Sequence, residues 1–259
     1  MPKLSIITIN HNNLKGLKRT VESVVNQTWQ EFEFVVIDGG STDGSAAYIE
    51  SQSEYIDYWV SEPDTGIYNA MNKGIVKATG KYLLFLNSGD HLYSNEVLEQ
   101  NHKSLNLYDI VYFNLLVVDR KTNFVKTYPD TLSFSYFVVD TLPHQATFIR
   151  ATLFNKIGLY DESLVIVSDW KFFIESICTF NSSYLRIDRL LSTFYFDGIS
   201  SDFKNRELLS REREHVLNSD FKGYIEDVKQ LLMLRTIVSN FRKSRKIGLL
   251  VKLGLLHKF

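Results

Sequence analysis

Cysteine and proline are scarce in this chain of 259 residues, which has one cysteine, Cys178, and four prolines. A single thiol excludes an internal disulfide scaffold and a zinc site built from several cysteines, and it suits a reducing compartment. The 13 glycines and four prolines are also too few for a collagen-like or low-complexity chain. We expect Cys178 to lie in the core, on the apolar side of a helix.

Long apolar runs are missing as well. The longest candidate, IGLLVKLGLL near the C-terminus, is interrupted by Lys252 and is shorter than the roughly 18 apolar residues that a membrane-spanning helix needs. The first residues, MPKLSIITIN, have no small-residue cleavage site, so they predict a first strand and not a signal peptide. We therefore expect a cytoplasmic protein.

Acidic residues are absent from the last part of the chain. After Asp227 there are eight Lys or Arg residues, whereas residues 1–227 carry 21 positive and 30 negative side chains. Apolar residues recur at helical spacing in this basic tail: Leu231, Leu234, Val238 and Phe241, and then Ile247, Leu250, Val251 and Leu255. Such a tail suits the anionic inner face of the plasma membrane. The alternative is that its apolar faces pack on the rest of the protein. The overall net charge of -1 argues against nucleic acid as a partner.

What the chain does have is enough apolar surface for a core, with 44% hydrophobic residues. Its first 90 residues predict strands over 4–8, 32–37, 56–60 and 82–86, with helices between them. This β-α-β-α-β-α-β order predicts an α/β fold with a mainly parallel sheet flanked by helices.

The second half is less regular. It predicts strands over 110–118, 124–128, 147–150, 184–187 and 193–196, a helix from about 168, and helices almost throughout from about 203. The simplest partition is one domain over 1–205 and a helical, basic C-terminal extension over 206–259.

Small polar or acidic residues follow each of the first four strands. They are Thr8, Asn10, Asp38, Glu62, Asp64, Asn87 and Asp90. In an open parallel sheet, ligands bind beyond the carboxyl ends of the strands. Each residue alone is explained as a turn or helix-cap residue. Several carboxylates at one edge repel one another, however, unless a cation or hydrogen-bond donors share the site.

Two common phosphate-binding motifs are absent: G-x-G-x-x-G after the first strand, and G-x-x-x-x-G-K-[ST] anywhere. The first absence argues against a dinucleotide site of the Rossmann type, and the second excludes a P-loop. Carboxylate oxygens are the ligands that Mg²⁺ and Mn²⁺ prefer. The residues together indicate a metal-assisted site for a phosphorylated ligand, with a nucleotide as the best candidate.

Three segments carry a resemblance to a known family: SIITINHNN, VVIDGGSTDGS, and SEPDTGIYNAMNKGIVKATGKYLLFLNSGD. Together they resemble the N-terminal half of family-2 glycosyltransferases of the GT-A fold, of the type that builds bacterial O-antigen and capsular polysaccharides. The resemblance is strong over residues 3–93. It continues more loosely through PHQATFIR, GLYDES and SDW, and the tail beyond about 205 has no matching motif.

The resemblance implies roles for residues at matching positions. Thr8, Asn10 and Asp38 would hold the nucleotide, and Asp38 would accept a hydrogen bond from uracil N3–H. The Asp64 segment would line the same pocket. NSGD, residues 87–90, stands where the family has its Asp-X-Asp metal motif, so Asp90 would bind Mn²⁺ or Mg²⁺ and Asn87 and Ser88 would face the donor. Asn87 and Gly89 replace acidic residues of that motif, which reduces the charge available to the metal.

The resemblance also implies a catalytic base. Asp169, in SDW, stands where the family's base is expected, although an Asp at a helix start is also a common N-cap. His144 and Gln145 resemble a loop that borders donor and acceptor, and Glu162 is a second candidate base.

These expectations combine into an inverting, metal-dependent glycosyltransferase. It would use a nucleotide-diphosphate sugar, with a UDP-sugar preferred, and a glycan acceptor. The family resemblance implies that this acceptor is lipid-linked. Two alternatives stay open: a catalytically impaired nucleotide-sugar-binding or scaffold protein, because NSGD is depleted in acids, and a sugar-phosphate nucleotidyltransferase. The latter needs a Gly-rich, Arg-containing loop after the first strand, where this chain has NHNNLKGLK.

Overall fold

A computed structural model describes residues 2–119, 122–195 and 203–257. Its strands are β1 (Leu4–Asn10), β2 (Phe32–Asp38), β3 (Tyr58–Ser61), β4 (Tyr82–Phe85), β5 (His91–Leu92), β6 (Ile110–Val118), β7 (Asn123–Lys126), β8 (Thr147–Arg150) and β9 (Tyr184–Tyr195). Its helices are α1 (Leu14–Val25), α2 (Ser45–Ser51), α3 (Ile67–Lys77), α4 (Val97–Asn101), α5 (Phe134–Val139), α6 (Thr152–Ile157), α7 (Ser168–Ile174), α8 (Arg206–Asp220), α9 (Lys222–Lys243) and α10 (Arg245–Lys252). The expected β-α-β-α-β-α-β order of the first half is confirmed.

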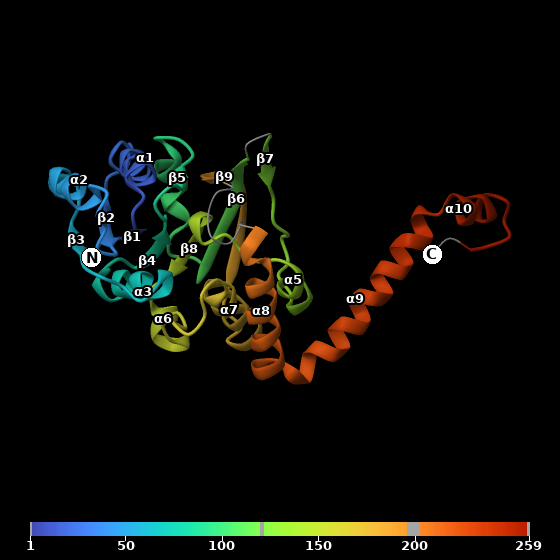
Figure 1. Cartoon of the computed structure of the whole chain (residues 1–259). Helices are drawn as coiled ribbons and strands as arrows, with labels where there is room; N and C mark the ends of the chain where they lie inside the picture. Colours follow the sequence, from blue (N-terminus) through green and yellow to red (C-terminus); the bar gives the residue numbers. More distant parts are fainter. Residues whose placement is uncertain (1, 120–121, 196–202, 258–259) are drawn as a thin grey trace. The chain divides into compact units, whose positions relative to one another are not determined.

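The strands form one sheet in the order β3-β2-β1-β4-β8-β6-β9-β5, with β7 paired to β6 (Figure 1). The first four strands in this order are parallel, as an apolar run such as LSIITIN suggests, since β1 is buried along its whole length. The second half adds antiparallel pairs, because β8 runs opposite to both β4 and β6. The two expected strands over 184–187 and 193–196 are one strand, β9, and Phe196 lies outside the described residues.

Helix α3 packs on β1 and β2, and its close approach depends on Gly74. A Cβ on Gly74 would lie 2.4 Å from the Ile7 Cγ2 atom, so a larger residue would push the helix off the sheet. Figure 1 shows α1, α2 and α3 beside the parallel strands, and α5, α6 and α7 beside the second half. The core of the domain therefore lies between this sheet and the flanking helices.

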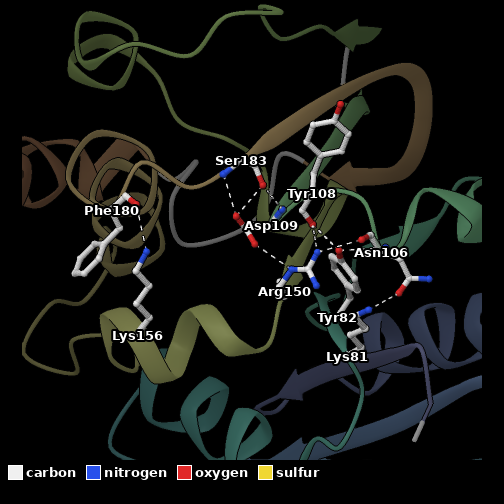
Figure 2. A network of polar contacts seen from close by, with 9 residues as sticks. All are labelled: Lys81, Tyr82, Asn106, Tyr108, Asp109, Arg150, Lys156, Phe180 and Ser183. Carbon is white, nitrogen blue, oxygen red and sulfur yellow. Dashed lines mark hydrogen bonds and ion pairs between the residues drawn. The ribbon is translucent and has the colours of Figure 1, made fainter.

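A polar network joins the amino ends of β4, β6 and β9 (Figure 2). The Arg150 guanidinium pairs with Asp109 at 3.0 Å, donates to the Tyr108 carbonyl and lies over the Tyr82 ring. Asp109 also accepts from the Ser183 amide and hydroxyl, just before β9. Burial raises the pKa of Asp109, but these donors and Arg150 outweigh it and hold that pKa below its ordinary value. The network fixes the edge of the sheet opposite the carboxyl ends of the parallel strands.

The chain divides into two compact units, Met1–Glu212 and Arg213–Phe259, so the boundary falls inside α8. The second unit contains α9 and α10, which confirms that the tail is helical. None of the helices in the described part of the chain combines the length and apolar character of a bilayer-spanning segment.

Candidate active site

A pocket of about 520 Å³ lies at the carboxyl ends of β1 and β4. Both halves of the first unit contribute to it, because α7 and the turn before β8 also reach it. The sequence-predicted residues that line it are Asn10, Asp64, Asn87, Ser88, Asp90, His144 and Asp169. The sheet edge expected to bind the ligand is therefore hollow, with these polar groups set in a largely apolar lining.

Asp169 is held by two donors in this pocket. The Tyr68 hydroxyl, on the first turn of α3, donates to Asp169 Oδ1 at 2.9 Å. The His144 Nδ1 atom lies 3.0 Å from Asp169 Oδ2. Because a carboxylate only accepts, the proton of this bond belongs to His144 Nδ1. Residues that are far apart in the sequence thus converge on one carboxylate.

The ionisation of Asp169 follows from these contacts. Burial alone would raise its pKa, but the hydrogen bonds from His144 and Tyr68 outweigh burial and hold the pKa below its ordinary value. Burial likewise lowers the pKa of His144, and the bond to Asp169 more than reverses this, so the imidazole pKa is raised. Burial and the neighbouring Asp169 charge raise the pKa of Tyr68 well above its usual value. At neutral pH the pocket therefore holds a charged carboxylate beside a neutral phenol.

The helix-cap explanation of Asp169 is not supported. The N-cap of α7 is Val167, and no side chain caps this helix. Asp169 lies inside the first turn, where the helix dipole favours a negative charge, and its side chain bonds to Tyr68 and His144.

The turn over residues 87–90 is fixed by α1. The Thr20 hydroxyl donates to the Asp90 carbonyl at 2.6 Å and accepts from the Gly89 amide at 3.0 Å. Asn13 Nδ2 donates to the Ser88 carbonyl. Asp90 is 7% exposed and its side chain lines the pocket. The turn is thus a rigid platform that presents one carboxylate.

The residues of this turn fit a divalent metal only when other ligands join them. No group of three or more His, Cys, Asp and Glu side chains with metal-binding geometry occurs among the described residues. Near Asp90, however, the buried Asn87 Oδ1 has no hydrogen-bond partner in the described structure, so an oxygen ligand is available. Mg²⁺ is commonly held by one or two carboxylates with substrate phosphates and water. The turn suits a metal shared with a diphosphate.

Thr8 and Asp38 lie below the pocket and do not line it. Both are fully buried; the Thr8 hydroxyl donates to the Leu86 carbonyl. The Asp38 carboxylate accepts hydrogen bonds from the Asn10 amide, the Ser41 amide and hydroxyl, and the Ser61 hydroxyl. Burial would raise the pKa of Asp38, but these donors keep it lowered. The expected contact of Asp38 with uracil N3–H would require one of them to be displaced.

Asp64 and His11 lie nearer the pocket than Asp38, and Gly39 makes room for them. A Cβ on Gly39 would lie 2.3 Å from Asp64 Oδ2 and 3.0 Å from His11 Nδ1. Asp64 is anchored through Oδ1, which accepts from the Gly66 amide. These two side chains therefore join Asn10 among the polar groups at the β1–β2 side of the pocket.

Gln145 and Glu162 are also outside the pocket lining. Gln145 is buried, and its carbonyl accepts from the Ser192 hydroxyl of β9. Glu162 accepts from the side-chain amides of Asn69 and Asn72, and it lines a smaller pocket of about 300 Å³ over β3 and α3. Glu162 thus connects α3 to the segment after α6.

Sequence reasoning missed Tyr68, His11 and Asn13 as pocket residues. Tyr68 was detectable, because a tyrosine on the first turn of the helix after Asp64 must lie at the same sheet edge. Its bond to Asp169 was not, because that contact depends on how the irregular second half folds back.

Residues 5–158 match the family model described as Glycosyl transferase family 2. An uncharacterised glycosyltransferase of Mycobacterium tuberculosis (strain CDC 1551 / Oshkosh) is 37% identical over 185 residues, which are 68% of this chain and 69% of that protein. A PGL/p-HBAD biosynthesis glycosyltransferase of Mycobacterium bovis (strain BCG / Pasteur 1173P2) is 32% identical over 219 residues, 81% of this chain and 84% of that protein.

Solved structures share the fold. Residues 1–349 of S. aureus TarS in complex with UDP-GlcNAc match with a TM-score of 0.62 and 18% identity, over 83% of this chain and 67% of that one. In another structure of the same TarS fragment, the match covers 60% of the length of the TarS chain. The mannosyltransferase PcManGT of Pyrobaculum calidifontis, in complex with GDP-Man and Mn²⁺, matches with a TM-score of 0.56 and 15% identity, over 74% of this chain and 56% of that one.

Proposed function

Because the chain belongs to glycosyl transferase family 2, we propose that it transfers a sugar from a nucleotide-diphosphate donor to a glycan acceptor with inversion at the anomeric carbon. The observation that carries this proposal is the Asp169 carboxylate, kept ionised in the pocket by Tyr68 and His144. Inversion in one step needs a carboxylate near the acceptor hydroxyl, and Asp169 lines the same pocket as the Asn87–Asp90 turn.

The reaction is a displacement at the sugar C1 atom. The acceptor oxygen forms a bond to C1 while the bond from C1 to the diphosphate oxygen breaks, and its electron pair leaves with the diphosphate. Asp169 takes the acceptor proton through a carboxylate oxygen. Tyr68 and His144 hold this carboxylate in place throughout the step.

The donor we propose is a UDP-sugar, a hexose or N-acetylhexosamine. TarS, whose fold this chain shares, is known in complexes with UDP and with UDP-GlcNAc, which supports this choice. Asp64 and His11 are the polar groups available to the nucleoside, and Asn10 Oδ1 is buried without a partner among the described residues. An unpartnered buried oxygen suits a ligand that donates a hydrogen bond.

The metal we propose is Mn²⁺ or Mg²⁺ at Asp90, with Asn87 Oδ1 and the donor diphosphate as further oxygen ligands. When bound, such an ion supplies charge neutralisation for the departing diphosphate. Because the turn has one carboxylate, the protein supplies few of the metal's ligands. We therefore expect the metal to bind weakly until the diphosphate is present.

The acceptor we propose is lipid-linked and lies at the inner face of the plasma membrane, in surface polysaccharide synthesis of the O-antigen type. The basic tail supports this, because no acid follows Asp227 and several apolar side chains of α9 and α10 are exposed. A relative is named as a PGL/p-HBAD biosynthesis glycosyltransferase, which fits a biosynthetic role.

A binding panel tests the donor and metal parts of the proposal. The full chain is titrated with UDP, GDP and dTDP, each with Mn²⁺ and with EDTA, by calorimetry. UDP with Mn²⁺ is expected to bind most tightly. Tighter binding of another nucleotide would overturn the donor assignment, and equal UDP affinity in EDTA would overturn the metal assignment.

Turnover separates the proposed enzyme from the alternatives. UDP release from UDP-sugars is measured with a bacterial lipid extract as acceptor. Donor binding without UDP release would indicate the scaffold alternative, and pyrophosphate release from a nucleoside triphosphate would indicate a nucleotidyltransferase.

A further inference from the structure

We propose, on the basis of the proposed function, that His144 is a positioning residue for Asp169 that links the base to the Asn87–Asp90 turn. The ring bridges two groups that lie on separate elements. Its Nδ1 atom donates to Asp169 Oδ2 on α7, and its Nε2 atom lies 3.3 Å from Asn87 Nδ2, which follows β4. One side chain thus spans the distance between the carboxylate and the turn.

Both contacts of the His144 ring are compatible with a single tautomer. With the proton on Nδ1, the Nε2 atom is an acceptor and takes a hydrogen from the Asn87 amide. This arrangement leaves the Asn87 Oδ1 atom free to face a ligand, since it has no partner in the described structure. The orientation of the Asn87 amide therefore follows from the tautomer that Asp169 imposes on His144.

Asp169 needs such a partner because its own element is short. Helix α7 has seven residues and no side-chain cap, and it continues into a π-helical turn over Glu175–Thr179. The Asp169 side chain is 15% exposed, so ligands reach it. The side-chain bonds from Tyr68 and His144, together with a backbone bond from Trp170, hold the carboxylate. A misplacement of about 1 Å at a reacting group can cost about 100-fold in rate.

The charged and titratable groups around the pair come from three parts of the chain. Tyr68 lies on α3, Tyr160 lies between α6 and α7, and Asp90 lies in the turn after β4. Burial raises the pKa of both tyrosines, and the Asp169 charge adds to this. Burial lowers the pKa of His144, but its bond to Asp169 and the Asp169 charge, with a smaller contribution from Asp90, raise it overall. Loss of the His144 donor removes a contact that lowers the Asp169 pKa, so this pKa rises.

Two substitutions test the role of Nδ1. His144→Asn keeps a donor, because the Asn amide nitrogen stands where Nδ1 stood, whereas His144→Leu has a similar size and no donor. Turnover, donor KM, melting temperature and the pH dependence of kcat/KM are measured on the full chain. We expect His144→Leu to lose roughly 10-fold to 100-fold in kcat with little change in KM. Its acid limb should move to higher pH, and His144→Asn should recover most of both properties.

Other results would overturn the inference. If both variants lose the acid limb and activity equally, His144 itself accepts the proton. If His144→Leu changes only the melting temperature, the residue is structural. Where His144→Leu does not fold, His144→Gln replaces it, because its amide reaches the Nε2 position and leaves Asp169 without the Nδ1 donor. An active Asp169→Asn variant would instead refute the proposed function, which keeps the two failures distinct.

Discussion

Asp90 is the one carboxylate in the turn over residues 87–90, so its removal tests the metal directly. Asp90→Ala should lose 10²-fold to 10³-fold in turnover, because a transition-state contact to the departing diphosphate is lost. The fold should survive, since the turn is held mainly by backbone bonds to Thr20. Steady-state kinetics at several Mn²⁺ concentrations provide the measurement.

The matched control is Glu96→Ala, which also removes a carboxylate, but at an exposed position outside the pocket lining. It should retain most of the activity. Unchanged turnover in Asp90→Ala, or full wild-type activity in excess EDTA, would contradict the metal assignment.

Asp169 should be essential for turnover and dispensable for binding. Asp169→Asn keeps the size of the side chain and the contact with Tyr68, but an amide does not accept a proton at neutral pH. We expect a loss of roughly 10²-fold or more in kcat with donor affinity little changed. Single-turnover kinetics and a UDP titration separate the two properties.

Glu162→Gln serves as the comparison for Asp169, because Glu162 lies outside the main pocket and bonds to Asn69 and Asn72. It should lower the melting temperature more than the rate. A larger rate loss in Glu162→Gln than in Asp169→Asn would make Glu162 the base.

Individual residues of the pocket were predictable where they follow a strand. Asn10 ends β1, Asp64 lies in the segment after β3, and Asn87 and Asp90 lie in the turn after β4; all four line the pocket. Asp38 follows the same rule yet does not line the pocket, because donors from Asn10, Ser41 and Ser61 occupy its carboxylate. Strand position therefore predicts the edge at which a residue lies, but not whether neighbouring donors will occupy its side chain.

Among the elements, the polar network of Figure 2 should contribute measurably to stability. Arg150→Met removes the ion pair with Asp109 and the bond to the Tyr108 carbonyl, and it leaves a carboxylate that is only 31% exposed without its cation. We expect a loss of roughly 1–3 kcal/mol in the free energy of unfolding. Urea denaturation measures this loss.

Lys156→Met provides the control in the same region, since Lys156 makes one exposed bond to the Phe180 carbonyl. Its cost should stay within about 0.5 kcal/mol. Equal stability of the two variants would mean that Arg150 contributes no more than a surface cation.

Elements were predicted well where a single periodicity persisted and poorly where it changed. The π-helical turn over Glu175–Thr179 is an example, because the wider turn rotates the following side chains. Cys178, expected in the core from helical spacing, is exposed for this reason, and the expectation was wrong. β9 was divided in two because Asp188 and Arg189 interrupt its apolar pattern.

At the scale of the whole molecule, the basic tail should bind anionic membranes. Leu234, Phe241, Leu249 and Leu253 are between 48% and 63% exposed on α9, on α10 and just after α10. Each basic residue near an anionic surface is worth about 1 kcal/mol before screening. The full chain should therefore sediment with phosphatidylglycerol vesicles and release at high salt, whereas neutral vesicles should not retain it.

A charge variant sharpens this test. Replacing the basic cluster around Ser244 by glutamine, at Arg242, Lys243, Arg245 and Lys246, should abolish sedimentation. Neutralising four exposed lysines of the first unit, Lys15, Lys18, Lys77 and Lys103, should not. Equal binding by the two variants, or no binding by the wild type, would remove the membrane partner.

The position of β8 has a consequence for how the chain folds. β8 lies between β4 and β6 and pairs with both, through Leu83↔Ile149 and Ile110↔Ile149. During synthesis β1 to β4 emerge long before β8, so β4 remains an open edge strand until residue 150 has left the ribosome. Such non-local pairing slows folding, because a long loop must close before the contact forms. A nascent chain halted before β8 is therefore the species most exposed to edge-to-edge association, and chaperones would engage it at this stage.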